Sequence, residues 1–371
     1  MDKISITANR ADKLLLKEYI KYLIKEVKNI EEVDGYINFL RKCEKSITEF
    51  MGVEDTLLVN SWTDAIQLSL LSLNVKKGDE VIIPATTYIS VALAIWYTGA
   101  KVVPVDISEE DMLIDAGKLK RKITPKTKVI IMVHMFGHSC KIDEIVNIAK
   151  EYNIKIIDNA CQAIGTKYKN KRVGSFGDIG TLSFSYAKTI SSFSGNGGAV
   201  LLKNKNDKER IRENFLDIFK GRNGLFKLDR KFHNISFLDA LTVYVKLKHF
   251  NEIEEKKILL RKIYEKELRE VNEVTIFPDS DDSVTVRPCF FILAEKRDSL
   301  IKYLYRKGIV CESSYPPLVV FKKFGKFNYN EFNVAFKCWK MGLRLPLFSY
   351  MEPGEAVRVC KEIKNFYARK K

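Results

Sequence analysis

One lysine stands in the part of the chain that is richest in small polar residues. Lys188 lies within GSFGDIGTLSFSYAKTISSFSGNGGAV, residues 174–200, after a β-branched run and before a loop of Ser and Gly. Most lysines are solvated surface charges, but a lysine at the edge of a sheet can be desolvated and lose its proton near neutral pH. Such an amine acts as a nucleophile or forms a Schiff base with a carbonyl group.

Phosphate contacts are expected from hydroxyl groups and backbone amides. The glycines near Lys188 form neither a Walker loop nor a GxGxxG fingerprint. In LLVNSWTDAIQLSLLSL, by contrast, a strand is expected to end at Ser61, and Thr63 is expected to cap the amphipathic helix that follows. The amino terminus of a helix binds a phosphate group favourably, so this segment is a candidate anion site.

A third polar feature ends a buried strand. In IKIIDNACQAIG, residues 154–165, an apolar run stops on Asp158 and Asn159. From about residue 55 to 203 such short runs alternate with longer amphipathic segments, which is typical of a mostly parallel sheet covered by helices on both faces. Ligand sites in these sheets lie at the carboxyl ends of the strands. The polar segments NSWT, PATTY, HMFGH, DNACQ and SFSYAK all fall there.

The rest of the chain predicts a second, smaller domain. Residues 237–268 read as one long helix, followed by an alternation of short strands and helices. The expected fold is a three-layer α/β/α domain with a mostly parallel sheet, plus a small C-terminal α+β domain. We place the large domain, with its N-terminal helices, at residues 1–245 and the small domain at residues 246–371.

Composition narrows the class of protein. The chain has 371 residues, 46% of them hydrophobic and 30% charged, with no signal-peptide core and no apolar run near the roughly 20 residues of a membrane span. We therefore expect a cytoplasmic protein without a membrane span. The seven cysteines and four histidines lack disulfide or metal-ligand spacing and predict no metal site.

The net charge of +16 is the one unusual property of the composition. It favours anionic partners such as phosphorylated metabolites, acidic lipid surfaces or nucleic acid, unless the lysines merely solvate helix faces. The chain carries no Arg-rich tail and no nucleic-acid-binding module, so a nucleic acid partner is not expected.

The order of the motifs resembles a known family, the DegT/DnrJ/StrS-type sugar aminotransferases. These are enzymes of fold type I that use pyridoxal phosphate (PLP). The resemblance runs over about residues 45–365 and rests on NSWTDAI, GDEVIIPATTYIS, GAKVVPVDI, VHMFGHSCKIDEI, IIDNACQAIG, GSFGDIGTLSFSYAK, GNGGAV and RLPLFSYMEPGEAVRVCKEI. It implies that Lys188 forms the Schiff base with PLP and then shuttles a proton between the cofactor and the substrate carbon.

The resemblance also implies contacts between side chains and the cofactor. Tyr88 matches the aromatic residue that stacks on the pyridine ring, and Gln162 matches the residue beside the phenolic oxygen. Ser183 and Thr63 match phosphate contacts, and the adjoining Ser61 belongs to the same expected phosphate cup.

The sequence departs from the family pattern at several of these positions. Asn159 stands where the family has the aspartate that pairs with the ring nitrogen, and an amide cannot supply that negative charge. Asp158 would replace it only if a bulge turned its side chain inward. Trp62 stands where a small residue is usual and either crowds the phosphate or points away. Phe232 and Asn234 align with an Asn-x-Arg motif that reaches the neighbouring subunit, where Asn234 is the candidate contact.

The resemblance implies an enzyme that transfers an amino group from an amino acid, with glutamate the expected donor, to a keto sugar carried on a nucleotide. Pyridoxamine phosphate (PMP) holds the amino group between the half-reactions, in the biosynthesis of amino sugars or surface polysaccharides. A homodimer with shared sites is implied. Two alternatives stay open: a dehydratase-like enzyme, against which Lys188 argues because that branch carries histidine there, and a non-catalytic binding or regulatory protein.

Overall fold

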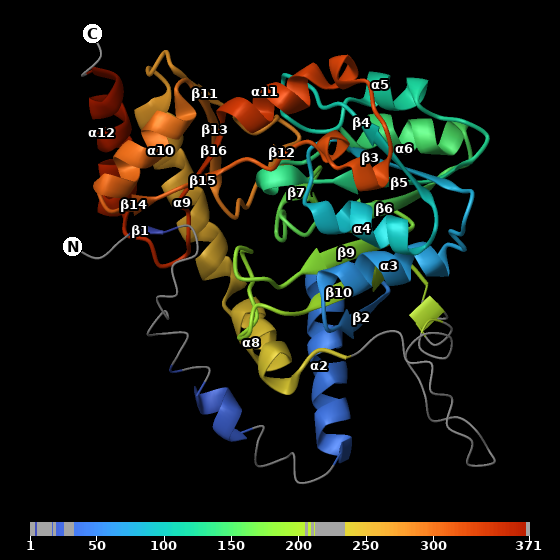
Figure 1. Ribbon diagram of the computed structural model, residues 1–371. Coiled ribbons are helices and arrows are strands. Elements are labelled where there is room, and N and C mark those ends of the chain that lie inside the picture. The colour runs from blue at the N-terminus through green and yellow to red at the C-terminus, as the bar shows by residue number, and fades with distance from the viewer. Residues whose placement is uncertain are drawn as a thin grey trace, which may run out of the picture.

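A seven-stranded sheet forms the centre of the molecule (Figure 1). The computed structural model describes residues 4–5, 17, 20–25, 33–204, 207–208, 211 and 234–368. In spatial order the strands are β2 (Asp55–Val59), β10 (Gly198–Leu202), β9 (Ile179–Ser183), β6 (Lys155–Asn159), β5 (Thr127–Val133), β3 (Glu80–Pro84) and β4 (Lys101–Val105). The strands from β9 to β4 pair in parallel, whereas β10 runs antiparallel to both β9 and β2.

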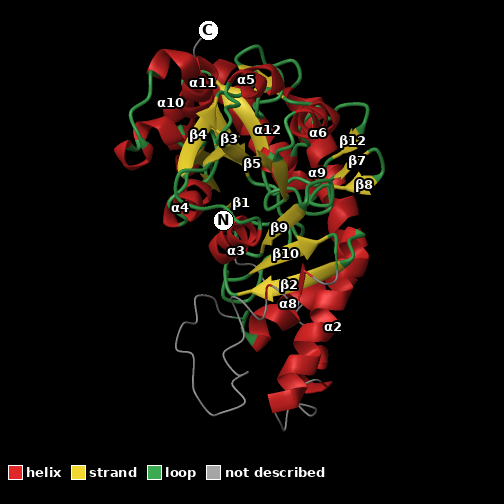
Figure 2. Cartoon of the chain, turned by 90° about the vertical axis from the view of Figure 1, so that its right-hand side faces the viewer, coloured by secondary structure: helices red, strands yellow, loops and turns green. Residues whose placement is uncertain are grey.

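Helices cover both faces of this sheet (Figure 2). β3, β9 and β10 are buried along their whole length, as is typical of the central strands of a covered sheet. The helices are α2 (Val33–Met51), α3 (Trp62–Ser72), α4 (Ile89–Tyr97), α5 (Ala116–Arg121), α6 (Ile142–Glu151), α8 (Phe237–Lys248), α9 (Phe250–Leu268), α10 (Arg297–Arg306), α11 (Asn333–Met341) and α12 (Pro353–Ala368). The expected α/β architecture with a mostly parallel sheet is confirmed.

A second sheet lies towards the C-terminus and has its own hydrophobic core. Its strands, in spatial order, are β11 (Val274–Ile276), β13 (Phe290–Ala294), β16 (Gly342–Leu345) and β15 (Glu312–Ser313). Side chains of α9, α10 and α12 pack on it. Two short sheets are also present. One contains β12 (Ser283–Val284), β7 (Lys167–Tyr168) and β8 (Lys171–Arg172), and the other pairs β1 (Ile4–Ser5) with β14 (Ile309–Val310). The domain boundary between residues 245 and 246 stays a prediction.

The prediction of one long helix over residues 237–268 was wrong. α8 and α9 are separated at His249, whose φ of −102° and ψ of 19° leave the helical region. The break turns Phe250 into the core, where its ring lies 4.6 Å from that of Phe50. Gly165 makes room for it, since a Cβ there would lie 2.1 Å from the Phe250 ring. The helix is interrupted because packing of this one aromatic side chain overrides helix propensity.

Other expectations have mixed outcomes. One of the N-terminal helices expected in the large domain is α2. The chain before residue 33 falls mostly outside the described residues, as does Phe232. All seven cysteines are buried and free, as small apolar residues would be. Among the helices in the described part of the chain, none has the length and apolar character needed to cross a membrane.

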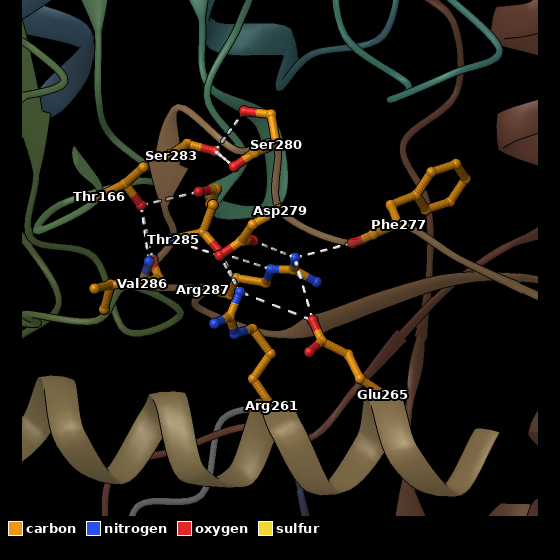
Figure 3. A network of polar contacts seen from close by, with 11 residues as sticks. Thr166, Arg261, Glu265, Phe277, Asp279, Ser280, Ser283, Thr285, Val286 and Arg287 are labelled. Atoms are coloured by element: carbon orange, nitrogen blue, oxygen red, sulfur yellow. Dashed lines mark hydrogen bonds and ion pairs between the residues drawn. The ribbon is translucent and has the colours of Figure 1, made fainter. Parts of the chain in front are cut away.

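A buried polar network ties the segment before β13 to α9 (Figure 3). The guanidinium of Arg287 donates to Asp279 Oδ1 at 2.7 Å and to the Phe277 carbonyl oxygen at 2.9 Å. Arg261 of α9 pairs with the same carboxylate. One carboxylate thus bridges two arginines that are almost inaccessible to solvent.

The same segment is fastened to the large sheet's loops. Thr166 Oγ1 accepts a hydrogen bond from the Val286 amide at 2.9 Å and donates one to the Gly137 carbonyl oxygen at 2.9 Å. Gly137 has a φ of +93°, and a Cβ there would lie 2.6 Å from Arg287 Cα. Only glycine allows the two backbones to approach this closely.

Candidate functional site

Lys188 lies on the loop that follows β9, at the carboxyl edge of the parallel strands. Its backbone amide donates to the Ser185 carbonyl oxygen at 3.0 Å, and its side chain is half-buried. Burial lowers the pKa of the Lys188 amine, and the positive charge of Arg344 acts in the same direction. The lowered pKa favours the neutral amine, the form able to accept a proton or attack a carbonyl.

Helix α8 holds this lysine loop in place. Asp239 accepts hydrogen bonds from the Ser194 amide at 2.6 Å and from the Ser194 hydroxyl at 2.8 Å. Lys246 Nζ donates to the Ser191 carbonyl oxygen at 2.7 Å and to its hydroxyl at 2.8 Å, and burial lowers the pKa of Lys246 to about 8. Neither residue could be identified from the sequence, because nothing in a helical pattern marks which polar side chains contact a distant loop.

Two buried amide side chains lie at and just beyond the end of β6. Asn159 is 1% exposed, and its Oδ1 accepts a hydrogen bond from the Cys161 amide at 3.1 Å. Gln162 Oε1 accepts one from the Phe136 amide at 3.1 Å. Since each oxygen is held by a backbone N–H, each NH2 group is directed away from that backbone contact. Asn159 Nδ2 is buried and has no hydrogen-bond partner in the described part of the chain.

Asp158 faces the other way and does not replace the missing aspartate. Its Oδ1 lies 2.7 Å from His134 Nε2, and its Oδ2 accepts from the amides of Gly174 and Phe176, both at 2.8 Å. The β5–β6 register is regular through Asp158 and Asn159, so the bulge that would turn Asp158 inward is absent. Alternation along the strand therefore places the two side chains on opposite faces.

The candidate phosphate site is built where β2 passes into α3. Ser61, rather than Thr63, is the N-cap: its hydroxyl accepts from the Asp64 amide at 3.1 Å. The Thr63 prediction was wrong because the helix already begins at Trp62, one residue earlier. Gly198 lets β10 approach this turn, since a Cβ there would lie 2.8 Å from Trp62 Cα.

Ser183 reaches the same corner from β9. It is paired with Gly198 across the β9–β10 ladder, and Ser61 forms a bridge with Gly197. The Ser183 hydroxyl donates to Ser185 Oγ at 3.4 Å. The structure thus brings Ser61, Ser183 and the start of α3 together, as expected for side chains at neighbouring strand ends.

Aromatic side chains lie beside this corner. The Tyr88 ring lies 6.3 Å from Trp62 and 5.7 Å from Tyr315, and Tyr88 is 48% exposed. Tyr315 is in turn stacked with Phe136 at 6.3 Å. The Trp62 side chain therefore lies beside Tyr88, and its expected effect on the cofactor's phosphate stays a prediction.

The model of the DegT/DnrJ/EryC1/StrS aminotransferase family matches residues 17–364. The chain belongs to this family.

Relatives with named activities align with nearly the whole chain. GDP-perosamine synthase of Escherichia coli O157:H7 is 32% identical over 343 residues, covering 90% of this chain and 91% of the relative. The dTDP-3-amino-3,4,6-trideoxy-alpha-D-glucose transaminase of Streptomyces venezuelae is 28% identical, covering 88% and 86%. The crystal structure of S. venezuelae DesV in complex with a ketimine intermediate is 25% identical, with a TM-score of 0.86 and coverage of 99% of both chains.

The protein is an aminotransferase, and its cofactor is PLP. The non-catalytic and dehydratase-like alternatives are not favoured. The residues present fit this cofactor. They provide an amine of lowered pKa, hydroxyl groups beside the start of α3, and buried polar atoms without a hydrogen-bond partner among the described residues. Besides Asn159 Nδ2, the Thr189 hydroxyl next to Lys188 is buried with no hydrogen bond to any described residue.

Arg344 is a cation near Lys188 that was not among the residues expected from the sequence. It lies on β16, and its guanidinium donates to the Tyr315 hydroxyl at 2.9 Å and to Glu312 Oε2 at 2.5 Å. It is close enough to Lys188 to lower the pKa of that amine. Its motif was visible in the sequence, but only the tertiary fold brings the second sheet to the lysine.

Asn234 lies on the surface, just before α8. Its neighbour Ile235 packs beneath Gly197, where a Cβ would come within 2.5 Å of the Ile235 side chain. The expected contact of Asn234 with a neighbouring subunit stays a prediction.

Proposed function

We propose that this aminotransferase moves an amino group from an amino acid, with glutamate as the expected donor, to a keto sugar carried by a nucleotide. The observation that carries the proposal is the Lys188 amine, with its lowered pKa, at the same sheet edge as Asn159 and Gln162. Relatives named for GDP-linked and dTDP-linked amino sugars support the substrate class. The net charge of +16 suits a diphosphate-bearing substrate.

PLP supplies the electron-withdrawing ring and stores the amino group, as PMP, between the two half-reactions. We assign the cofactor's phosphate to the corner formed by Ser61, Thr63, Ser183 and the amides that begin α3, including that of Trp62. These groups are donors at a helix amino terminus, where a negative charge is stabilised.

The remaining cofactor contacts follow from the side chains around Lys188. Tyr88 is assigned to cover one face of the ring, beside Trp62. Gln162 is assigned to donate from its NH2 group to the phenolic oxygen, since its carbonyl oxygen is held by the Phe136 amide. With the cofactor bound, Lys188 Nζ would be the base that takes the proton from the substrate carbon and gives it back.

We further propose a homodimer in the cytoplasm. Tyr186 and Phe193, on the lysine loop, are 56% and 60% exposed, and Leu238 at the start of α8 is exposed as well. Large apolar side chains gathered beside a site are typical of a protein interface. Asn234, exposed before α8, is assigned to the partner's phosphate.

Reconstitution with PLP tests the function. We expect the absorbance band of the bound cofactor to change to that of PMP on addition of glutamate, with release of 2-oxoglutarate measured by mass spectrometry. The PMP form is then mixed with GDP-linked and dTDP-linked keto sugars, one of which should restore the first band and gain an amino group. A cofactor band that no amino acid changes would contradict the proposal.

Replacing Arg344 with glutamine should weaken binding of the amino donor. We assign the donor's carboxylate to this guanidinium, which Tyr315 and Glu312 orient. A charge-assisted hydrogen bond contributes about 1.5–3 kcal/mol, so the KM for glutamate should rise about 10- to 100-fold in steady-state assays. Arg358→Gln on α12, where the side chain donates to the Lys307 carbonyl oxygen, is the matched control. An unchanged KM for glutamate in Arg344→Gln would refute the assignment.

A further inference from the structure

The orientation of the Asn159 amide is determined by its backbone contact. The Cys161 N–H can only donate, so the side-chain atom that lies 3.1 Å from it is the oxygen. The NH2 group is therefore at the other end of the amide. It is buried and unpaired among the described residues, and an unpaired buried donor is destabilising. A partner outside the polypeptide would remove that cost.

The unpaired NH2 group lies on the side of β6 that faces the lysine. Asn159 is in register with Thr181 of the parallel strand β9, so their side chains share one face of the sheet. On that face Thr181 Oγ1 lies 3.8 Å from Cys161 Sγ, and the Cys161 thiol is one of the groups that affect the pKa of Lys188.

No carboxylate of β6 reaches this face. Both oxygens of Asp158 are engaged on the opposite face, by His134 and by two backbone amides. The end of β6 therefore offers a ligand one neutral donor, the Asn159 NH2 group. A positive charge on the ligand would instead need a negatively charged acceptor at this place.

We propose that Asn159 Nδ2 donates a hydrogen bond to the ring nitrogen of PLP and thereby keeps that nitrogen unprotonated. An unprotonated ring nitrogen has a lone pair that accepts a hydrogen bond from an N–H. A protonated ring nitrogen is itself a donor and cannot accept one from the Asn159 NH2 group. The inference rests on the proposed cofactor site and concerns its charge. A neutral ring withdraws electrons less strongly, so more of the catalysis falls on the proton transfer by Lys188.

Nitrogen-15 NMR of the holoenzyme tests the proposal. The protein is loaded with PLP labelled at the ring nitrogen, whose chemical shift separates pyridine from pyridinium without reference to activity. We expect the pyridine shift in the wild type at every pH at which it is folded, and a pyridinium shift in Asn159→Asp, whose carboxylate can accept the proton's hydrogen bond. Asn153→Asp, an exposed residue after α6, should leave the shift unchanged.

Two results would overturn the inference and can be told apart. A pyridinium shift in the wild type would contradict it while the proposed function stands. Failure of the folded protein to take up labelled PLP would overturn the inference and the cofactor site together. The wild-type spectrum decides between them even if Asn159→Asp does not fold.

Discussion

Lys188→Ala should lose nearly all turnover, by about 10²- to 10⁴-fold, because it removes the only amine that we assign to the reacting carbon. Burial lowers the pKa of this amine, which favours the neutral form that accepts a proton. Alanine leaves no group of suitable basicity at that position. The measurement is the rate at which glutamate changes the absorbance of the bound cofactor, followed by stopped flow.

Two controls separate proton transfer from structural damage. Lys155→Ala, at the start of β6, removes an exposed lysine that is paired with Asp178 and should leave the rate unchanged. Small alkylamines added to Lys188→Ala should restore part of the rate if the variant lacks only a base. Normal turnover by Lys188→Ala without added amine would exclude this lysine from the chemistry.

Asp158→Ala should destabilise the fold by about 3 kcal/mol or more, the largest loss of stability that we expect from a single substitution near the site. The carboxylate is fully buried and satisfies three donors, one on His134 and two on the backbone that follows β8. Alanine leaves all three unpaired in the interior. The free energy of unfolding, from denaturant titration of the wild type and the variant, measures the loss.

Asp298→Ala is the matched control for this substitution. Asp298 is mostly exposed and pairs with Arg297 at the start of α10, so its loss should cost less than about 1 kcal/mol. If Asp158→Ala were equally mild, the buried contacts of Asp158 would not hold β6 in place.

The sequence predicts those residues of the candidate site that lie at the ends of strands. Lys188, Asn159 and Ser183 each follow a buried apolar run, and parallel strands bring such positions to one edge. Element boundaries were harder, because Ser61 and Thr63 are both good capping residues, and only the backbone geometry shows that the first of them is the cap.

Contacts between distant segments could not be predicted. Arg344, Asp239 and Lys246 influence or hold the lysine loop from elements that follow it in sequence by about 50 to 150 residues. Their positions depend on how the second sheet and α8 pack, which no local pattern encodes. The break at His249 also depends on tertiary packing, because Phe250 packs against Gly165 there.

The close contact of Gly137 with Arg287 links the two hydrophobic cores. Thr166 and Val286 fasten the same place, and Arg287 continues into the buried pair with Asp279. If the two sheets separated while each stayed folded, these charged and backbone groups would lose their partners. That loss opposes the unfolding of one sheet without the other. The chain should therefore behave as one cooperative folding unit, in which damage to the small sheet also disables the lysine site.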